Sequence, residues 1–279
     1  FADDAKAMGI DTLVLASGVR SSIQTLSEMI RAEHFDIVHC HGSRANMIGA
    51  ILKRTIKVPI VTTVHSDYRL DYLGRPFHRL TYGTINTVAL RMFDYHIGVS
   101  DAMVQLLISR GFDPQRLFSI YNGVEFPPKP AKLSRGAYLS GLGLTFDEET
   151  VVFGIAARLN PVKDIATLIR GFAAACKTCL NIRLVIAGDG EERQMLESLS
   201  KELCPAGSVA FAGWVQDTDS FYNAIDVNML TSLSEGSPYA LVEGARMRCA
   251  TIATSVGGIP YMMESGVTGL LFTPRDVET

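Results

Sequence analysis

The segment 234–243 concentrates side chains that can do chemistry. It reads Ser-Glu-Gly-Ser-Pro-Tyr-Ala-Leu-Val-Glu and follows a short apolar run, 227–230. Ser237 suits the N-cap of a helix and Pro238 its first position, so we predict a helix over 238–247. Backbone N–H groups at a helix start, together with the helix dipole, form an anion site that suits a diphosphate. The residues predicted to carry it are Ser237, Pro238, Tyr239, Ala240 and Leu241.

Two glutamates lie on either side of this helix start. Glu243 is about five residues into the helix, which at ~1.5 Å per residue places it roughly 7–8 Å beyond the free amides. That distance matches the span from a diphosphate to its ribose, and a carboxylate there can accept hydrogen bonds from ribose hydroxyls. Glu235 precedes the helix and is expected to face the other end of the ligand. The spacing is equally compatible with an ordinary helix start and two solvated glutamates.

Two cations follow a predicted strand in the second half of the chain. Arg158 and Lys163 lie in the loop 157–164, directly after the strand predicted at 151–156. Fixed cations at the carboxyl end of a strand can neutralise a leaving diphosphate without a metal ion. The alternative is a solvated surface, where most Arg and Lys side chains lie.

A glycine-containing turn at 187–192 follows another apolar run and opens a helix. It differs from the dinucleotide fingerprint because Arg193 occupies the place of the third glycine and the unit is not the first of its domain. We therefore do not predict NAD binding. Gly188 and Gly190 still permit close approach of a nucleotide base or phosphate.

Histidines mark two strand ends in the first half. His65 follows the apolar run 61–64, at a carboxyl end where polar groups of a cleft lie in parallel sheets. His39 and His41 flank Cys40 at another strand end. Because no carboxylate accompanies these side chains, we predict no metal site. The G-x-S-x-G pattern of a serine nucleophile does not occur.

Short β-branched runs alternate with longer amphipathic stretches, which is the pattern of βαβ units in a parallel sheet. Predicted strands are 36–40, 59–64, 95–99, 116–120, 151–156, 183–187, 208–211, 227–230 and 251–254; predicted helices are 43–53, 101–110, 165–177, 192–203, 218–224 and 238–247. A Pro-containing and polar stretch interrupts the pattern between 126 and 150. We predict an α/β protein with two tandem Rossmann-like domains, 1–130 and 131–279, and a ligand cleft between them.

Composition narrows the class of protein. The net charge is -3, from 26 basic and 29 acidic residues without long runs of one sign, so nucleic acid is not a predicted partner. No apolar run approaches the ~20 residues of a membrane-spanning helix. Five cysteines favour a reducing compartment over a disulfide framework, and hence a cytoplasmic location.

Both ends of the chain fall inside predicted elements. The sequence opens without Met in a predicted helix, 1–8, which a predicted strand at 12–16 follows. It stops in a run with helix-start character, 274–278. We therefore expect a fragment that lacks elements at both ends.

Taken in order, the motifs resemble the retaining glycosyltransferases of GT-B fold, family 4, over nearly the whole chain. The resemblance rests on 35–42, 61–65, 98–100 and 122–124 in the first half, and on 157–159 with Lys163, 187–190, 235–243 and 256–260 in the second. It implies transfer of a sugar from a nucleoside diphosphate sugar with retention at the anomeric carbon. It implies no obligatory metal. It also implies no cofactor, because the nucleotide sugar is the donor substrate.

The resemblance also implies residue roles. Arg158 and Lys163 would stabilise the departing diphosphate, Glu243 would hold the ribose, and Glu235 and His65 would contact hydroxyls of the donor sugar. The chain departs from the family pattern after Glu243, where Gly244, Arg248 and Ala250 replace Ala, Gly and Pro. It also lacks the family's amino-terminal strand with its Gly-rich loop and its carboxyl-terminal helix, which leaves the activity of the fragment alone open.

Three functions are consistent with these residues. The first is a retaining hexosyl- or N-acetylhexosaminyltransferase with a cell-envelope, lipid-linked or saccharide acceptor. The others are a non-catalytic nucleotide-sugar-binding protein and a UDP-sugar epimerase of GT-B fold. Acceptor contacts are expected on loops such as 67–79, where Tyr68, Tyr72 and Phe77 mix with Arg69, Arg75 and Arg79. That mixture suits an anionic lipid headgroup at the inner membrane face and equally suits an ordinary surface loop.

Overall fold

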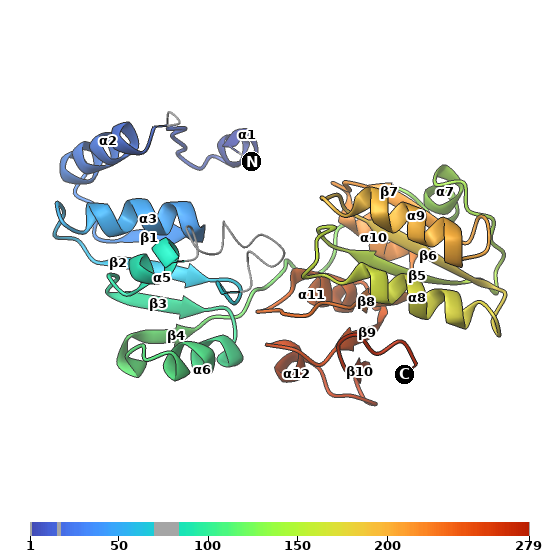
Figure 1. Ribbon diagram of the computed structural model, residues 1–279. Coiled ribbons are helices and arrows are strands. Elements are labelled where there is room, and N and C mark those ends of the chain that lie inside the picture. The colour runs from blue at the N-terminus through green and yellow to red at the C-terminus, as the bar shows by residue number, and fades with distance from the viewer. Residues whose placement is uncertain (1, 16–17, 70–83, 279) are drawn as a thin grey trace.

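A computed structural model describes residues 2–15, 18–69 and 84–278. It contains two α/β domains, each built on its own parallel sheet, and Figure 1 shows them side by side with α11 and α12 on the side of the C-terminal domain that faces the N-terminal one. Residues Tyr72, Arg75, Phe77 and Arg79 of the predicted acceptor loop lie outside the described residues.

The N-terminal domain holds a four-stranded parallel sheet in the order β1-β2-β3-β4. Its strands are β1 Val38–His41, β2 Ile60–Val64, β3 Tyr95–Gly98 and β4 Leu117–Ser119; its helices are α1 Ala2–Ala7, α2 Val19–Ala32, α3 Gly42–Leu52, α5 Thr84–Leu90 and α6 Asp101–Ser109. Cys40, Ile60 and Phe93 belong to a buried cluster that includes side chains of α2 and α3. Ser100 caps α6, because its Oγ accepts a hydrogen bond from Met103 N at 3.2 Å.

The C-terminal domain holds a six-stranded parallel sheet in the order β10-β9-β8-β5-β6-β7. Its strands are β5 Val151–Ala156, β6 Ile182–Ala187, β7 Val209–Gly213, β8 Val227–Leu230, β9 Ala250–Thr254 and β10 Leu270–Phe272; its helices are α7 Arg135–Gly141, α8 Ile165–Ala175, α9 Arg193–Leu203, α10 Thr218–Ala224, α11 Tyr239–Arg246 and α12 Ile259–Met262. From β5 the chain builds outward through β6 and β7, and from β8 it builds the other way. The order of strands therefore reverses between β5 and β8, where α/β proteins bind ligands.

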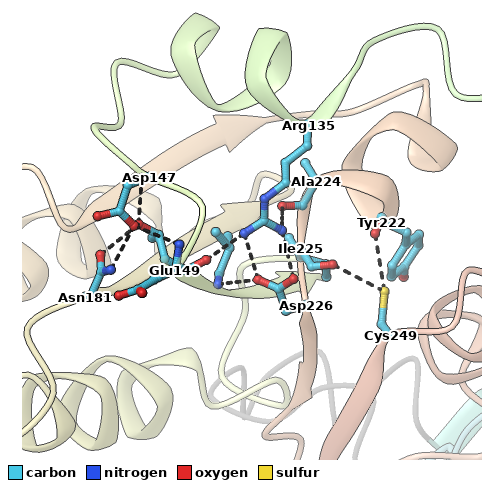
Figure 2. Close-up of polar contacts among 11 residues, drawn as sticks. Arg135, Asp147, Glu149, Asn181, Tyr222, Ala224, Ile225, Asp226 and Cys249 are labelled. Atoms are coloured by element: carbon cyan, nitrogen blue, oxygen red, sulfur yellow. Dashed lines mark hydrogen bonds and ion pairs between the residues drawn. The ribbon is translucent and has the colours of Figure 1, made fainter.

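Arg135 joins the first helix of this domain to its central strands (Figure 2). Its guanidinium forms two hydrogen bonds to the Asp226 carboxylate, at 2.9 and 2.8 Å, and a third to Thr150 O at 2.7 Å. Asp226 in turn accepts from Val152 N at 2.7 Å. A two-pronged contact of this kind fixes the geometry of both partners, so α7 is anchored where β5 and β8 begin.

The predicted α/β class and the two tandem domains with parallel sheets are confirmed. Two local predictions are wrong. The described residues of the predicted strand 12–16, residues 12–15, pair with no strand in the described part of the chain, and Leu13 and Val14 are exposed. An apolar composition favours a strand but does not ensure that a neighbouring strand is present to pair with it. Residues 274–278 form turns rather than a helix.

Four helices of the described residues were not predicted: α2, α5, α7 and α12. Within the residues that the structure describes, no helix combines the length and apolarity needed to cross a bilayer.

Candidate functional site

A cavity of about 710 Å³ lies where the sheet order of the C-terminal domain reverses. Its walls come from the loops that follow β5 and β8, and from His65, Ser66 and Asn122 of the N-terminal domain. Of the predicted site residues it brings together His65, Arg158, Lys163, Glu235, Ser237, Pro238, Tyr239 and Ala240. Gly188, Gly190, Leu241 and Glu243 are not part of its lining.

Backbone hydrogen bonds hold the loop after β5 in place. Leu159 N donates to Asp189 O at 3.0 Å, and Lys163 N donates to Asn160 O at 3.0 Å. Arg158 is exposed, and no ion pair holds its guanidinium in the described part of the chain. A cation with free donors at this position can bind an anionic group in the cavity.

Lys163 and Glu235 form an ion pair across the cavity floor. Lys163 Nζ lies 2.6 Å from Glu235 Oε1, and Ser232 Oγ donates to the same oxygen at 2.5 Å. The Glu235 side chain is 10% exposed, so these donors offset the cost of burying its charge. Because both bond Oε1, the second carboxylate oxygen has no partner among the described residues and can accept from a ligand hydroxyl.

The start of α11 differs in one detail from the prediction. The N-cap is Pro238, without a side-chain capping bond, and the helix begins at Tyr239. Pro238 has no N–H, and Leu241 N donates to Pro238 O at 3.1 Å. The first-turn amides left for an anion are those of Tyr239 and Ala240.

Ser237, predicted as the N-cap, forms a contact between the domains instead. It is buried, its Oγ accepts from Asn122 N at 3.3 Å, and its carbonyl accepts from Asn122 Nδ2 at 2.7 Å. Asn122 follows β4, so the N-terminal domain holds the residue that precedes the helix start.

Glu243 lies further along α11, half-buried beside the hydroxyl of Tyr222. Burial raises the pKa of its carboxyl, while the Tyr222 hydrogen bond and the nearby charge of Arg246 oppose the shift. No contact in the structure tests the predicted ribose role, which stays a prediction.

Gly188 and Gly190 pack against the loop after β5. A Cβ on Gly188 would lie 1.8 Å from Ala157 O, and one on Gly190 would lie 2.2 Å from Leu159 O. Gly188 also has φ +129°, which L side chains rarely adopt. The two glycines therefore allow the loops after β5 and β6 to touch, which is a structural reason for them that is independent of any ligand.

Three histidines lie together at the carboxyl ends of β1 and β2. His41 Nδ1 is 3.0 Å from His65 Nε2, and the rings of His39 and His41 are 4.2 Å apart between centroids. Burial lowers the pKa of His65, and the neighbouring His41 lowers it further. Among the residues described, no group of His, Cys, Asp and Glu has an arrangement that could hold a metal ion.

Close backbone packing joins the two domains beside the cavity. A Cβ on Gly236 would lie 2.3 Å from His65 O and 2.7 Å from Val99 Cγ2, both in the N-terminal domain. Gly236 and the residue that follows β2 are therefore in direct contact.

Several residues of the site were missed by the sequence analysis. Ser232 lies three positions before Glu235 but has no distinguishing pattern. Asn228, fully buried in β8, donates from Nδ2 to Ala240 O at 2.9 Å and so supports the start of α11. Its side chain occupies the space beside Gly244, where a Cβ would lie 2.5 Å from Nδ2. An alanine at position 244 would therefore collide with the Asn228 side chain.

Comparison with known proteins identifies both domains. Residues 15–126 match the family model described as Glycosyltransferase Family 4, and residues 150–279 match the one described as Glycosyl transferases group 1. Among curated proteins, the chain is 26% identical to the UDP-Gal:alpha-D-GlcNAc-diphosphoundecaprenol alpha-1,3-galactosyltransferase of Escherichia coli, over 99% of this chain and 73% of that protein. It is also 26% identical to the D-inositol 3-phosphate glycosyltransferase of Mycobacterium ulcerans, over 88% of this chain and 54% of the relative.

Solved structures share the fold. Anabaena HepE in complex with UDP-glucose aligns with a TM-score of 0.81 and 23% identity, covering 99% of this chain and 76% of HepE. The sucrose-phosphate synthase of Thermosynechococcus elongatus aligns with a TM-score of 0.77 and 19% identity, covering 93% of this chain and 66% of that one. With two glycosyltransferase models matched in order along two Rossmann-like domains, the chain is a glycosyltransferase of GT-B fold and of the family 4 type.

Proposed function

We propose that the protein transfers a hexosyl or N-acetylhexosaminyl group from a nucleoside diphosphate sugar, with retention at the anomeric carbon and without a metal ion. The observation that carries the proposal is the cavity at the β5–β8 reversal, which is lined by Arg158, Lys163 and the first two residues of α11, Tyr239 and Ala240. Backbone donors and fixed cations converging on one space suit a diphosphate leaving group.

Charge accounts for the metal-independent part of the proposal. A departing diphosphate needs positive charge that is already in position when the bond breaks. Arg158 supplies a free guanidinium, and Lys163 keeps two N–H donors beyond the one directed to Glu235. Turnover in the presence of EDTA equal to that with Mg²⁺ supports this account, and loss of turnover in EDTA contradicts it.

The proposal keeps the residue roles along the donor that the family resemblance implies. The diphosphate lies at the start of α11, Glu243 holds the ribose, and Glu235 with His65 contacts the transferred sugar. No nucleophile is assigned, and the donor phosphate acts as the base for the incoming hydroxyl. Support for a UDP-hexose comes from the relatives, because HepE was solved with UDP-glucose and the E. coli enzyme is named for UDP-Gal.

The acceptor belongs to the class of saccharide or lipid-linked molecules. Support comes from the E. coli relative, whose name specifies a diphosphoundecaprenol-linked sugar. The proposal includes a cytoplasmic location with peripheral contact at the inner face of the membrane. The five free cysteines are in keeping with that compartment.

The test is a transfer assay with UDP-, GDP- and ADP-sugars and a panel of saccharide and lipid-linked acceptors. Arg158→Gln and Lys163→Met should each lower kcat/KM by about 10²-fold, because each removes a charge that stabilises the leaving group. Arg170→Gln is the matched control, since Arg170 is an exposed cation of the same domain that is not part of the cavity lining. Wild-type turnover in both cavity variants contradicts the residue assignments.

The same assay separates the proposed function from the two alternative functions. Product anomeric configuration, read from the ¹H coupling constant, tests retention directly. Interconversion of UDP-sugars without any acceptor identifies an epimerase, and donor binding without turnover on any acceptor identifies a non-catalytic binding protein.

A further inference from the structure

The side chain of His65 is held by a second histidine that the proposed function does not use. His41 ends β1, and its register partner on β2 is Thr63, two residues before His65. This places His41 Nδ1 at 3.0 Å from His65 Nε2. His41 is not part of the cavity lining, whereas His65 is.

His41 is in turn in contact with a third histidine, His39. The His39 ring packs on it at 4.2 Å between centroids, and His39 Nε2 lies 2.8 Å from Thr63 Oγ1. The three rings therefore form a row that begins at a strand hydroxyl and ends at the cavity. On the other side, the close approach of Gly236 to His65 O restrains the His65 main chain.

A hydrogen bond between two imidazoles defines what each ring offers to others. A neutral imidazole has one N–H donor and one acceptor nitrogen, so in the bond between His41 Nδ1 and His65 Nε2 one nitrogen donates and the other accepts. The bond thereby couples the tautomer of each ring to that of the other. Because His65 Nε2 is bonded to His41, its Nδ1 is the nitrogen left for a ligand. Without His41, the ring is free to rotate and to exchange between tautomers.

We propose that His41 is a positioning residue that orients the His65 ring and couples its tautomer to its own, so that His65 Nδ1 is the nitrogen presented to a hydroxyl of the donor sugar. The choice of hydroxyl rests on the proposed function. The coupling of the two rings does not, because it is a property of the ligand-free protein.

The experiment compares His41→Ala with His41→Asn. Asparagine can place a polar atom near the position of His41 Nδ1 but cannot titrate, so it separates hydrogen bonding from charge. His34→Asn is the control, because His34 is exposed, lies outside the site, and has a φ of +52° that asparagine tolerates. Ring ¹⁵N shifts of [¹⁵N]histidine-labelled protein report the tautomer of His65, assigned by their loss in His65→Gln.

We expect wild-type protein and His34→Asn to show the His65 ring shifts of a hydrogen-bonded Nε2, and His41→Ala to show the averaged ring shifts of a freely exchanging imidazole. Donor kcat/KM should fall roughly tenfold in His41→Ala, as for loss of one hydrogen bond, and recover to within about threefold in His41→Asn. Unchanged His65 shifts in His41→Ala overturn the inference. So does a donor kcat/KM that His41→Ala leaves at the wild-type value. If the wild-type protein itself transfers no sugar, the proposed function fails, and averaged shifts in His41→Ala still support the coupling of the rings.

Discussion

Replacing Gly236 with Ala should separate the domains without unfolding either of them. The three atoms nearest to the added Cβ all belong to the N-terminal domain, the closest being His65 O at 2.3 Å. Relief to an ordinary carbon–oxygen distance of about 3.3 Å requires the domains to move apart by about 1 Å. Gly236 has no positive φ, so alanine fits the backbone of its own domain.

A displacement of that size breaks the contact between Asn122 and Ser237. Its 2.7 Å hydrogen bond would lengthen to about 3.7 Å, beyond hydrogen-bonding range. Loss of this bond and of the weaker one to Ser237 Oγ costs about 1 kcal/mol each. Misplacing the two halves of an active site by about 1 Å lowers kcat/KM by up to about 10²-fold.

The assay combines kinetics with thermal unfolding and small-angle X-ray scattering. Gly236→Ala should leave both domains folded with an unfolding temperature lowered by only a few degrees, increase the radius of gyration and lose most of its kcat/KM. The control is Gly141→Ala, at the end of α7, where an added Cβ meets nothing within 4 Å. Full activity in Gly236→Ala, or a fall in unfolding temperature with an unchanged radius, would refute the reasoning.

Three other predictions test the supports of the site. Gly244→Ala should destabilise the protein by about 1–3 kcal/mol, because its Cβ collides with buried Asn228, and Asn228→Ser in the same chain should recover part of that loss in a denaturant-unfolding cycle. Ser232→Ala removes one of the two donors to Glu235 Oε1 and should lower kcat/KM about tenfold, whereas Ser232→Thr should preserve it. Burial lowers the pKa of His96 below 6.5, despite an opposing hydrogen bond to Leu90 O, so the unfolded chain binds more protons there. The stability contributed by neutral His96 is present above pH 6.5 and is lost as pH falls toward the lowered pKa. Between pH 7 and 5, the unfolding temperature of His96→Gln should therefore fall less than that of the wild-type protein.

Much of the fold follows from local sequence patterns. The strand 151–156 and the helix 218–224 were predicted with the bounds that the structure shows, because each combines a strong period with clear end signals. A strand was predicted at 12–16, and its described residues 12–15 pair with no strand in the described part of the chain, because pairing depends on a neighbour that composition does not reveal. The short helix α5 also escaped prediction, since seven residues carry little periodicity.

The residues of the candidate site were likewise predicted only in part. Arg158 and Lys163 were predicted from their place after a strand and Glu235 from its place before a helix start, and the cavity brings them together. The sequence does not show that Lys163 and Glu235 pair with each other across 72 positions, or that Asn122 contacts Ser237 across 115. Such contacts depend on how two domains dock, which no local pattern encodes. Gly188 and Gly190 fit the idea of nucleotide approach, yet their contacts are with the loop after β5.

A crystal structure with bound UDP-glucose would test the central claim most directly. The account predicts that the diphosphate lies within hydrogen-bonding distance of the Tyr239 and Ala240 amides and of the Arg158 guanidinium, with the sugar between Glu235 and His65. A nucleotide sugar bound elsewhere on the protein, with the cavity between β5 and β8 empty, would contradict it.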